Sequence, residues 1–186
     1  MLKHSVQNSI LGKISRLARD KRGVSAVEFA LLAPVMIGLY FGCAEIATGV
    51  GTDRKVSLIA AALANLSAQT ATIATADMTN ILDASGAIVS PYDATKLKMT
   101  ITCIKIDANK VATVKWSVTR NGTANSGTIT IPSALAVANS YLILSEASYA
   151  YTPTIGYTIS GTLNLSDKMY MTPRITAPTY GTTTCT

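Results

Sequence analysis

Residues 29–44 read FALLAPVMIGLYFGCA and contain no Asp, Glu, Lys or Arg. The apolar run begins at Val24, and its single carboxylate is Glu28. At a helical rise of about 1.5 Å per residue, residues 24–44 span roughly 30 Å, which is the thickness of a bilayer's hydrocarbon core. The sequence therefore predicts a transmembrane helix, which we place at residues 24–50.

The positive charge of the chain is concentrated in front of this helix. Residues 1–23 carry six basic side chains and one acidic one, whereas the rest of the chain carries ten and nine. The charged residues of this leader are Lys3, Lys13, Arg16, Arg19, Lys21, Arg22 and Asp20. Basic segments beside an apolar helix remain on the cytoplasmic side of the membrane. We therefore expect a cytoplasmic leader and an exported domain. We expect no nucleic-acid partner, because no folded basic face is indicated.

Several interpretations of the apolar run differ in how they treat Glu28. A cleaved secretory signal peptide has an apolar stretch of about 7 to 15 residues, which is shorter than this run. A lipoprotein signal at Cys43 fits poorly, because Tyr40 and Phe41 precede the cysteine. A charge near the bilayer centre costs about 2.5 to 3.5 kcal/mol. Two interpretations stay open: an uncleaved signal anchor whose Glu28 reaches the headgroups, and a helix whose Glu28 has a dedicated partner.

The residues around Glu28 resemble a known processing site. Residues 21–29, KRGVSAVEF, are similar to the cleavage region of type IV prepilin-like proteins, with basic residues, a glycine, four residues, a glutamate and an aromatic. Over Arg22 to Val56 the chain resembles the TadE/TadG-like pseudopilins of tight-adherence (Flp-type) pili. The resemblance includes the proline inside the apolar run and a second glutamate at Glu45.

The resemblance implies a structural role in a bacterial tight-adherence pilus or secretion apparatus. A prepilin peptidase would cut between Gly23 and Val24 on the cytoplasmic face of the inner membrane, and the new ammonium at Val24 would lie one helical turn from Glu28. Glu28 and Phe29 would then set the register of assembly. The expected partners are the membrane, the peptidase and other pilin or pseudopilin subunits or pilus assembly proteins. The alternative is an uncleaved, signal-anchored envelope protein that contacts the pilus machinery or a surface.

Pro34 and two glycines modify the helix. Pro34 has no N–H to bond back to Ala30, so we expect a kink there. Gly38 and Gly42 form a G-x3-G pair that permits close helix approach in lipid, although this motif alone is weak.

Beyond the membrane the helical pattern continues. Val56, Ile59, Leu63, Leu66, Thr70 and Ile73 recur at spacings of three and four, with strong helix formers between them. This spacing predicts an amphipathic helix extension at residues 51–76, continuous with the transmembrane helix and packed on the exported domain.

Residues 77–186 have the composition of a β-rich domain. Alternation predicts strands near 97–103, 112–119 and 141–152, with a bulge near Cys103 where Ile104 and Ile106 break the phase. The other expected elements are a turn at Asn121-Gly122, a strand at 128–131, a short helix at 133–138 and a final hairpin of 163–165 with 168–172. The predicted fold is α+β and pilin-like, with the helix on an antiparallel sheet of five or six strands.

Cys103 and Cys185 both fall in the exported part, where oxidation is permitted. We predict a disulfide between them, which would close a loop of about 80 residues and stabilise the fold by roughly 4 kcal/mol in the chain-entropy model. Two free thiols are the alternative.

Catalytic groups are scarce in the exported domain. His4 is the only histidine and lies in the leader. A histidine-assisted nucleophile or a histidine-based metal site is therefore not expected, and the carboxylates mark no constellation. No phosphate-binding or dinucleotide motif is present. We expect a structural protein rather than an enzyme, with no cofactor and no metal.

Overall fold

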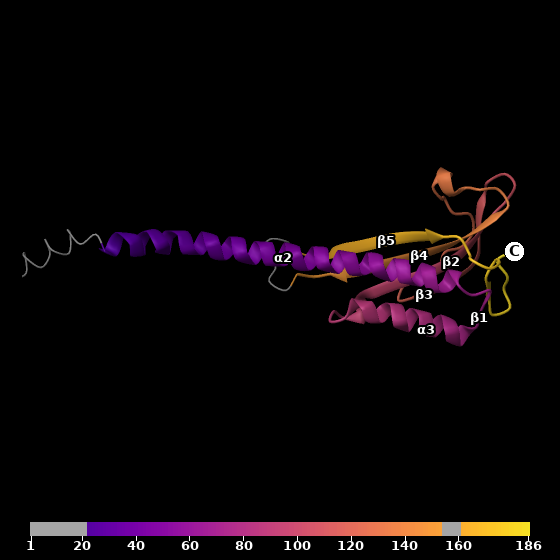
Figure 1. Ribbon diagram of the computed structural model, residues 1–186, viewed down its shortest axis with the longest axis horizontal. Helices are drawn as coiled ribbons and strands as arrows, with labels where there is room; N and C mark the ends of the chain where they lie inside the picture. Colours follow the sequence, from indigo (N-terminus) through magenta and orange to yellow (C-terminus); the bar gives the residue numbers. More distant parts are fainter. Residues whose placement is uncertain (1–21, 154–160) are drawn as a thin grey trace, which may run out of the picture. The chain divides into compact units, whose positions relative to one another are not determined.

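The computed structural model describes residues 22–153 and 161–186 and divides into two units, at Ala44 and Glu45 (Figure 1). The leader predicted at residues 1–23 lies outside the described residues, apart from Arg22 and Gly23. The elements are α2 (Arg22–Ala68), β1 (Thr72–Ile73), α3 (Thr75–Gly86), β2 (Leu97–Ile106), β3 (Ala112–Arg120), β4 (Ser140–Tyr151), β5 (Leu163–Met171) and β6 (Thr179–Tyr180). Short 3₁₀ turns occur at Ala87–Val89, Ala94–Lys96 and Ser133–Leu135. The fold is therefore α+β, with a long N-terminal helix and an antiparallel sheet.

In the first unit the described residues are helical throughout. α2 begins at Arg22 and continues through Pro34. The helix is long and apolar enough to cross a membrane, by length and composition. This agrees with the apolar segment that the sequence predicts.

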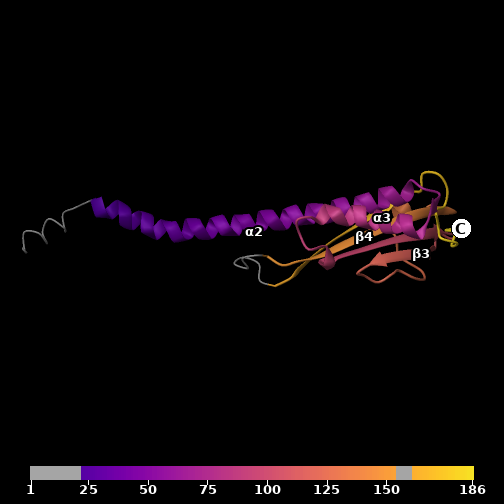
Figure 2. The ribbon, with the colours of Figure 1, turned by 90° about the horizontal axis from the view of Figure 1, so that it is seen from below.

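In the second unit α2 buries one stripe of its surface. Val56, Ile59 and Leu63 are fully buried at spacings of three and four, as the sequence predicts, whereas Leu58 between them is 59% exposed. The buried residues belong to one cluster with residues of β2 and β4 such as Ile101 and Ile143. This part of α2 therefore packs against the sheet, and Figure 2 shows α2 and α3 on the same side of it.

The predicted helix extension to residue 76 is wrong at its C-terminal end. α2 ends at Ala68, and a second helix, α3, which the sequence did not predict, opens the region expected to be β-rich. The backbone between the helices pairs with the C-terminal tail instead: β1 is parallel to β6. Ile73 is buried, as its spacing predicts, but it lies in β1 rather than on α2. Local helix propensity is overridden here by tertiary pairing.

The main sheet has four strands in the order β3-β2-β4-β5, all antiparallel. Five or six strands were expected, and the difference lies in two segments. Residues 163–171 form the single strand β5 rather than part of a hairpin, because they pair with β4 along their whole length, with Lys168 opposite Glu146. Residues 128–131 make only one bridge, between Thr128 and Thr113. The expected helix at 133–138 is a single 3₁₀ turn.

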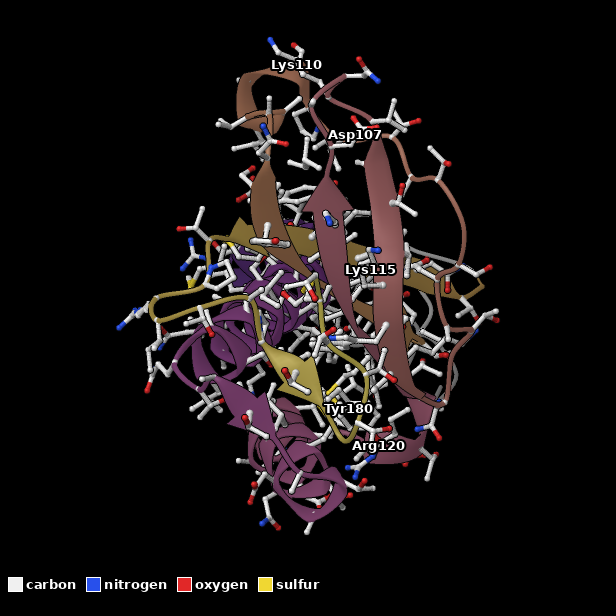
Figure 3. All side chains as sticks on the ribbon, turned by 90° about the vertical axis from the view of Figure 1, so that its right-hand side faces the viewer. Asp107, Lys110, Lys115, Arg120 and Tyr180 are labelled. Atoms are coloured by element: carbon white, nitrogen blue, oxygen red, sulfur yellow. A yellow bond between two sulfur atoms is a disulfide. The ribbon has the colours of Figure 1, made fainter. Side chains whose placement is uncertain are left out.

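The sheet has a core on each face. On β2, the odd-numbered residues Leu97 to Cys103 belong to the main core with α2, whereas Ile104 and Ile106 belong to a second cluster with Leu142 and Leu144. The second cluster explains the phase change in the sequence. The predicted bulge is present between Cys103 and Ile104, but the extra residue is Lys115 of β3 (labelled in Figure 3), because β2 pairs with β4 without interruption.

The C-terminal tail is fixed to the main core. The structure joins Cys103 and Cys185 in a disulfide, as the sequence predicts, and both residues are fully buried. The indole N–H of Trp116 donates to the carbonyl of Pro178 at 3.0 Å, and the rings of Trp116 and Tyr180 lie 5.7 Å apart. A disulfide that spans 82 positions in sequence stabilises the folded state by about 4 kcal/mol in the chain-entropy model.

The packing of α2 on the sheet can be tested with two neighbouring residues. We expect Ile59→Ala to lower the free energy of unfolding by about 2 to 5 kcal/mol, because it leaves a cavity in the main core. Leu58→Ala should change it by less than about 0.5 kcal/mol, because that side chain is largely exposed. Urea unfolding of the full chain in detergent, followed by the fluorescence of the buried Trp116, measures both effects. Equal losses would contradict the proposed orientation of the helix.

Candidate functional site

The predicted processing site lies in the first turn of α2. Gly23 and Val24 are both helical; Val24 is 53% exposed, and a Cβ at Gly23 would meet no described atom within 4 Å. A peptidase that cuts between them needs an extended substrate, so this turn has to unwind. Glycine adopts extended conformations readily, which favours this unwinding. Among the described residues nothing covers the bond at Gly23.

Glu28 and Val24 occupy the same side of the helix, one turn apart. Glu28 is exposed, and neither of the two ion pairs found among the described residues involves it. In a bilayer such a carboxylate is costly unless a cation neutralises it. An ammonium at Val24 would provide one, and it exists only if the chain is cut at Gly23.

The side chains that follow Glu28 are apolar on every side of the helix. Phe29 is 72% exposed, and the large residues between Leu31 and Phe41 are at least 40% exposed. A helix that is hydrophobic all round needs an apolar environment, such as lipid or neighbouring helices. The predicted site residues Gly23, Val24, Glu28, Phe29 and Pro34 thus lie together on one exposed helical segment.

Glu45 is the first residue of the second unit. It is 3% exposed, and Thr52, two turns further along α2, is fully buried. The hydroxyl of Thr48 donates to the carbonyl of Glu45 at 2.9 Å and lies 2.9 Å from the hydroxyl of Tyr151. The start of α2 in the second unit is therefore attached to the end of β4.

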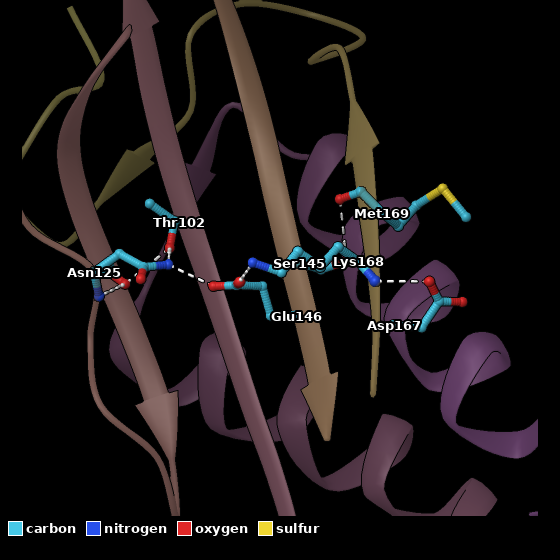
Figure 4. A network of polar contacts seen from close by, with 8 residues as sticks. Thr102, Asn125, Ser145, Glu146, Asp167, Lys168 and Met169 are labelled. Carbon is cyan, nitrogen blue, oxygen red and sulfur yellow. Dashed lines mark hydrogen bonds and ion pairs between the residues drawn. The ribbon is translucent and has the colours of Figure 1, made fainter. Parts of the chain in front are cut away.

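A polar network crosses the face of the sheet opposite α2 (Figure 4). The Asn125 amide donates to Glu146 Oε2 at 2.6 Å and to the hydroxyl of Thr102 at 3.0 Å. The Lys168 ammonium lies 2.6 Å from Glu146 Oε1. The hydrogen bond with Glu146 raises the pKa of Lys168, despite some desolvation. The lysine is thereby held as a cation, and the network fastens the loop after β3 to the sheet.

The described residues form a groove but no cluster of metal-ligating side chains. Within residues 22–153 and 161–186, no three His, Cys, Asp or Glu side chains come together as a metal site. A groove of about 610 Å³ lies among the start of β4, the end of β5 and the tail. Tyr149 and Tyr151 of β4 are buried. Tyr141 lines the groove; the sequence predicted only the strand that contains it, and no local pattern marks the groove.

The ion pair on the sheet predicts a dependence of stability on pH. We expect Glu146→Gln to lower the free energy of unfolding by about 0.5 to 1 kcal/mol near neutral pH, a small effect because Lys168 is largely exposed. A lysine pKa that is raised on folding contributes stability below its unfolded value, near 10.5, and loses it as the pH rises through the folded value. The difference between wild type and variant should therefore shrink above pH 10.5.

Urea titrations at a series of pH values measure this difference. Asp167→Asn is the matched control, because that carboxylate accepts the backbone N–H of Lys168 and forms no ion pair with a described residue. Its effect should not vary in this pH range. A Glu146→Gln difference that stayed constant above pH 10.5 would show that the ion pair contributes nothing.

Comparison with known proteins places the chain in no family. No family model matches it, and no curated protein and no solved structure is significantly similar to it. The function therefore has to be argued from the residues and geometry described above.

Proposed function

We propose that the chain is a pseudopilin or minor pilin-like structural component of a bacterial tight-adherence pilus or secretion apparatus, processed by a prepilin peptidase. The observation that carries this proposal is the two-part nature of α2. Residues 24–44 are apolar and exposed, whereas residues 45–68 bury a stripe against an antiparallel sheet. A subunit that is stored in a membrane and assembled through its helix needs both parts: one for lipid and other helices, one to carry the exported domain.

The sequence around the N-terminus of α2 supports the same role. This segment resembles the N-terminus of TadE/TadG-like pseudopilins. The shared features are Gly23, Glu28 four residues after Val24, and the adjacent aromatic Phe29. The exposed Glu28 gives this pattern a physical reason, since its charge requires a partner in lipid. The uncleaved envelope anchor is the competing function, and the helical conformation of Gly23 and Val24 favours it. The two functions differ in the mature N-terminus.

Processing can be tested by intact mass measurement of the chain extracted from membranes that contain a prepilin peptidase. We expect the wild type to begin at Val24 and Gly23→Leu to keep its leader, because a bulky side chain at this position obstructs an extended substrate. Gly51→Leu is the matched control: Gly51 is also an exposed glycine of α2 with open space around its Cα. It should be processed normally. A wild type that retains residues 1–23 would instead identify an uncleaved anchor, and a start beyond Ala44 a secreted protein.

The role of Glu28 can be tested separately from insertion. We expect Glu28→Gln to insert into the membrane as the wild type does, while its recovery in assembled, cross-linkable complexes falls by roughly tenfold, equivalent to about 1.4 kcal/mol. The reason is that a neutral amide cannot pair with an ammonium at Val24 of its own or a neighbouring helix. Asp53→Asn, an exposed carboxylate on the same helix, is the control. Normal assembly of Glu28→Gln would refute the register role.

A further inference from the structure

A groove lies at the end of the second unit where α2 terminates. The backbone N–H of Arg174, which follows β5, donates to the carbonyl of Ala68, the last residue of α2. The groove of about 610 Å³ opens beside this junction, between the first residues of β4 and the C-terminal tail. Pockets of about 300 to 1,000 Å³ hold small organic ligands, so the volume is in the range of a binding site. We name it the tail groove.

The side chains that line the tail groove are uncharged, and most of them bear hydroxyl groups. Its lining includes no Asp, Glu, Lys, Arg or His among the described residues. The hydroxyl-bearing side chains are Ser140, Tyr141, Thr172, Thr176, Thr179, Thr184 and Thr186. Each hydroxyl can donate and accept a hydrogen bond. An anionic ligand would find no cation here, and a purely apolar ligand would desolvate hydroxyls without replacing their bonds.

An aromatic ring and an exposed aliphatic side chain complete the lining. Tyr141 is half-buried and packs against the main core, so its ring is held in place where it borders the groove. Ile175 is 64% exposed at the same groove. A fixed ring with a polar tip, beside an aliphatic group and surrounded by hydroxyls, matches a ligand that has both C–H faces and hydroxyl edges. Neutral sugars have this combination.

The walls of the groove are fixed before any ligand binds. Thr184 precedes the buried Cys185 of the disulfide. Thr179 begins β6, and its backbone N–H donates to the carbonyl of Ala71 at 2.9 Å. The preceding residue, Pro178, accepts the indole N–H of Trp116. A site that is already ordered loses less conformational entropy when a ligand binds.

We propose that the tail groove binds neutral oligosaccharides, with the ring of Tyr141 against a sugar face and the threonine hydroxyls on the sugar's edges. This activity is independent of the proposed assembly role: a chain with an intact leader would have the same groove. It would make the exported unit a glycan-binding module. An extended peptide is the competing occupant, and the test includes it.

The test uses the full chain in lipid nanodiscs, because glycoside detergents would compete for the site. The probes are an array of neutral and sialylated oligosaccharides and a set of uncharged Thr- and Ser-rich peptides. We expect binding of neutral oligosaccharides with a Kd of about 1 mM or tighter, unchanged between low and high salt because no ion pair is involved. The proposal would be overturned if no neutral oligosaccharide bound in solution at up to about 10 mM, if sialylated glycans were preferred and salt abolished that preference, or if the peptides bound more tightly.

Three variants locate the binding to the groove. Tyr141→Leu keeps an apolar side chain against the core and removes the ring; it should weaken binding at least tenfold, with thermal unfolding as the check on folding. Thr172→Val removes one exposed hydroxyl without loss of volume and should weaken binding severalfold. Thr123→Val, an exposed threonine in a separate pocket of about 190 Å³, is the control. If Tyr141→Leu does not fold, Thr172→Val decides, and wild-type affinity in that variant would refute the site.

Discussion

Beyond Glu45, the side chains that α2 contributes to the main core come from one stripe, and the arrangement of the second unit follows from it. Large residues such as Ile59 and Leu63 alternate along the stripe with Ala60 and Ala64, which allow the helix to approach the sheet closely. The Ser145 hydroxyl of β4 donates to the carbonyl of Ala60 at 2.5 Å, a helical acceptor in the middle of the interface. This bond and the packing fix the rotation and the register of the helix on the sheet.

The same helix has no such stripe before Glu45, where large apolar side chains are exposed on all sides. The change occurs without a break in α2. A helix in lipid gains little from a preferred apolar side, whereas a helix on a sheet needs one. In the proposed setting, the burial pattern of α2 therefore reflects two environments: lipid before Glu45, and the sheet with water beyond it. Glu28 stands out because it belongs to neither pattern.

Local periodicity was sufficient to predict the elements whose partners impose a regular pattern. The apolar run from Val24 and the buried positions Val56, Ile59 and Leu63 repeat with helical spacing, and β4 alternates over most of its length. The disulfide followed from the compartment and the cysteine count. The site residues on α2 were found for the same reason, since they form one continuous segment. The second core was not anticipated, because Ile104 and Ile106 are covered by residues 129–135, whose own sequence has no clear period.

The end of α2 was mispredicted because it is decided by residues about 100 positions away. Alanines and the spacing up to Ile73 favour continued helix, and nothing local opposes it except the β-branched Thr70 and Thr72. In the folded chain, the backbone N–H of Arg174 instead donates to the carbonyl of Ala68, and β6 pairs with β1.

Backbone hydrogen bonds to the tail replace the backbone hydrogen bonds that a longer helix would form. Their number and kind alone therefore do not determine where α2 ends. In this arrangement Ile73 is buried, and the disulfide and the hydrogen bond from Trp116 to Pro178 hold the tail in place. The same tail residues therefore pair with the backbone that follows α2 and form one wall of the tail groove. For this reason neither feature can be recognised in the sequence of α2 or of the tail alone.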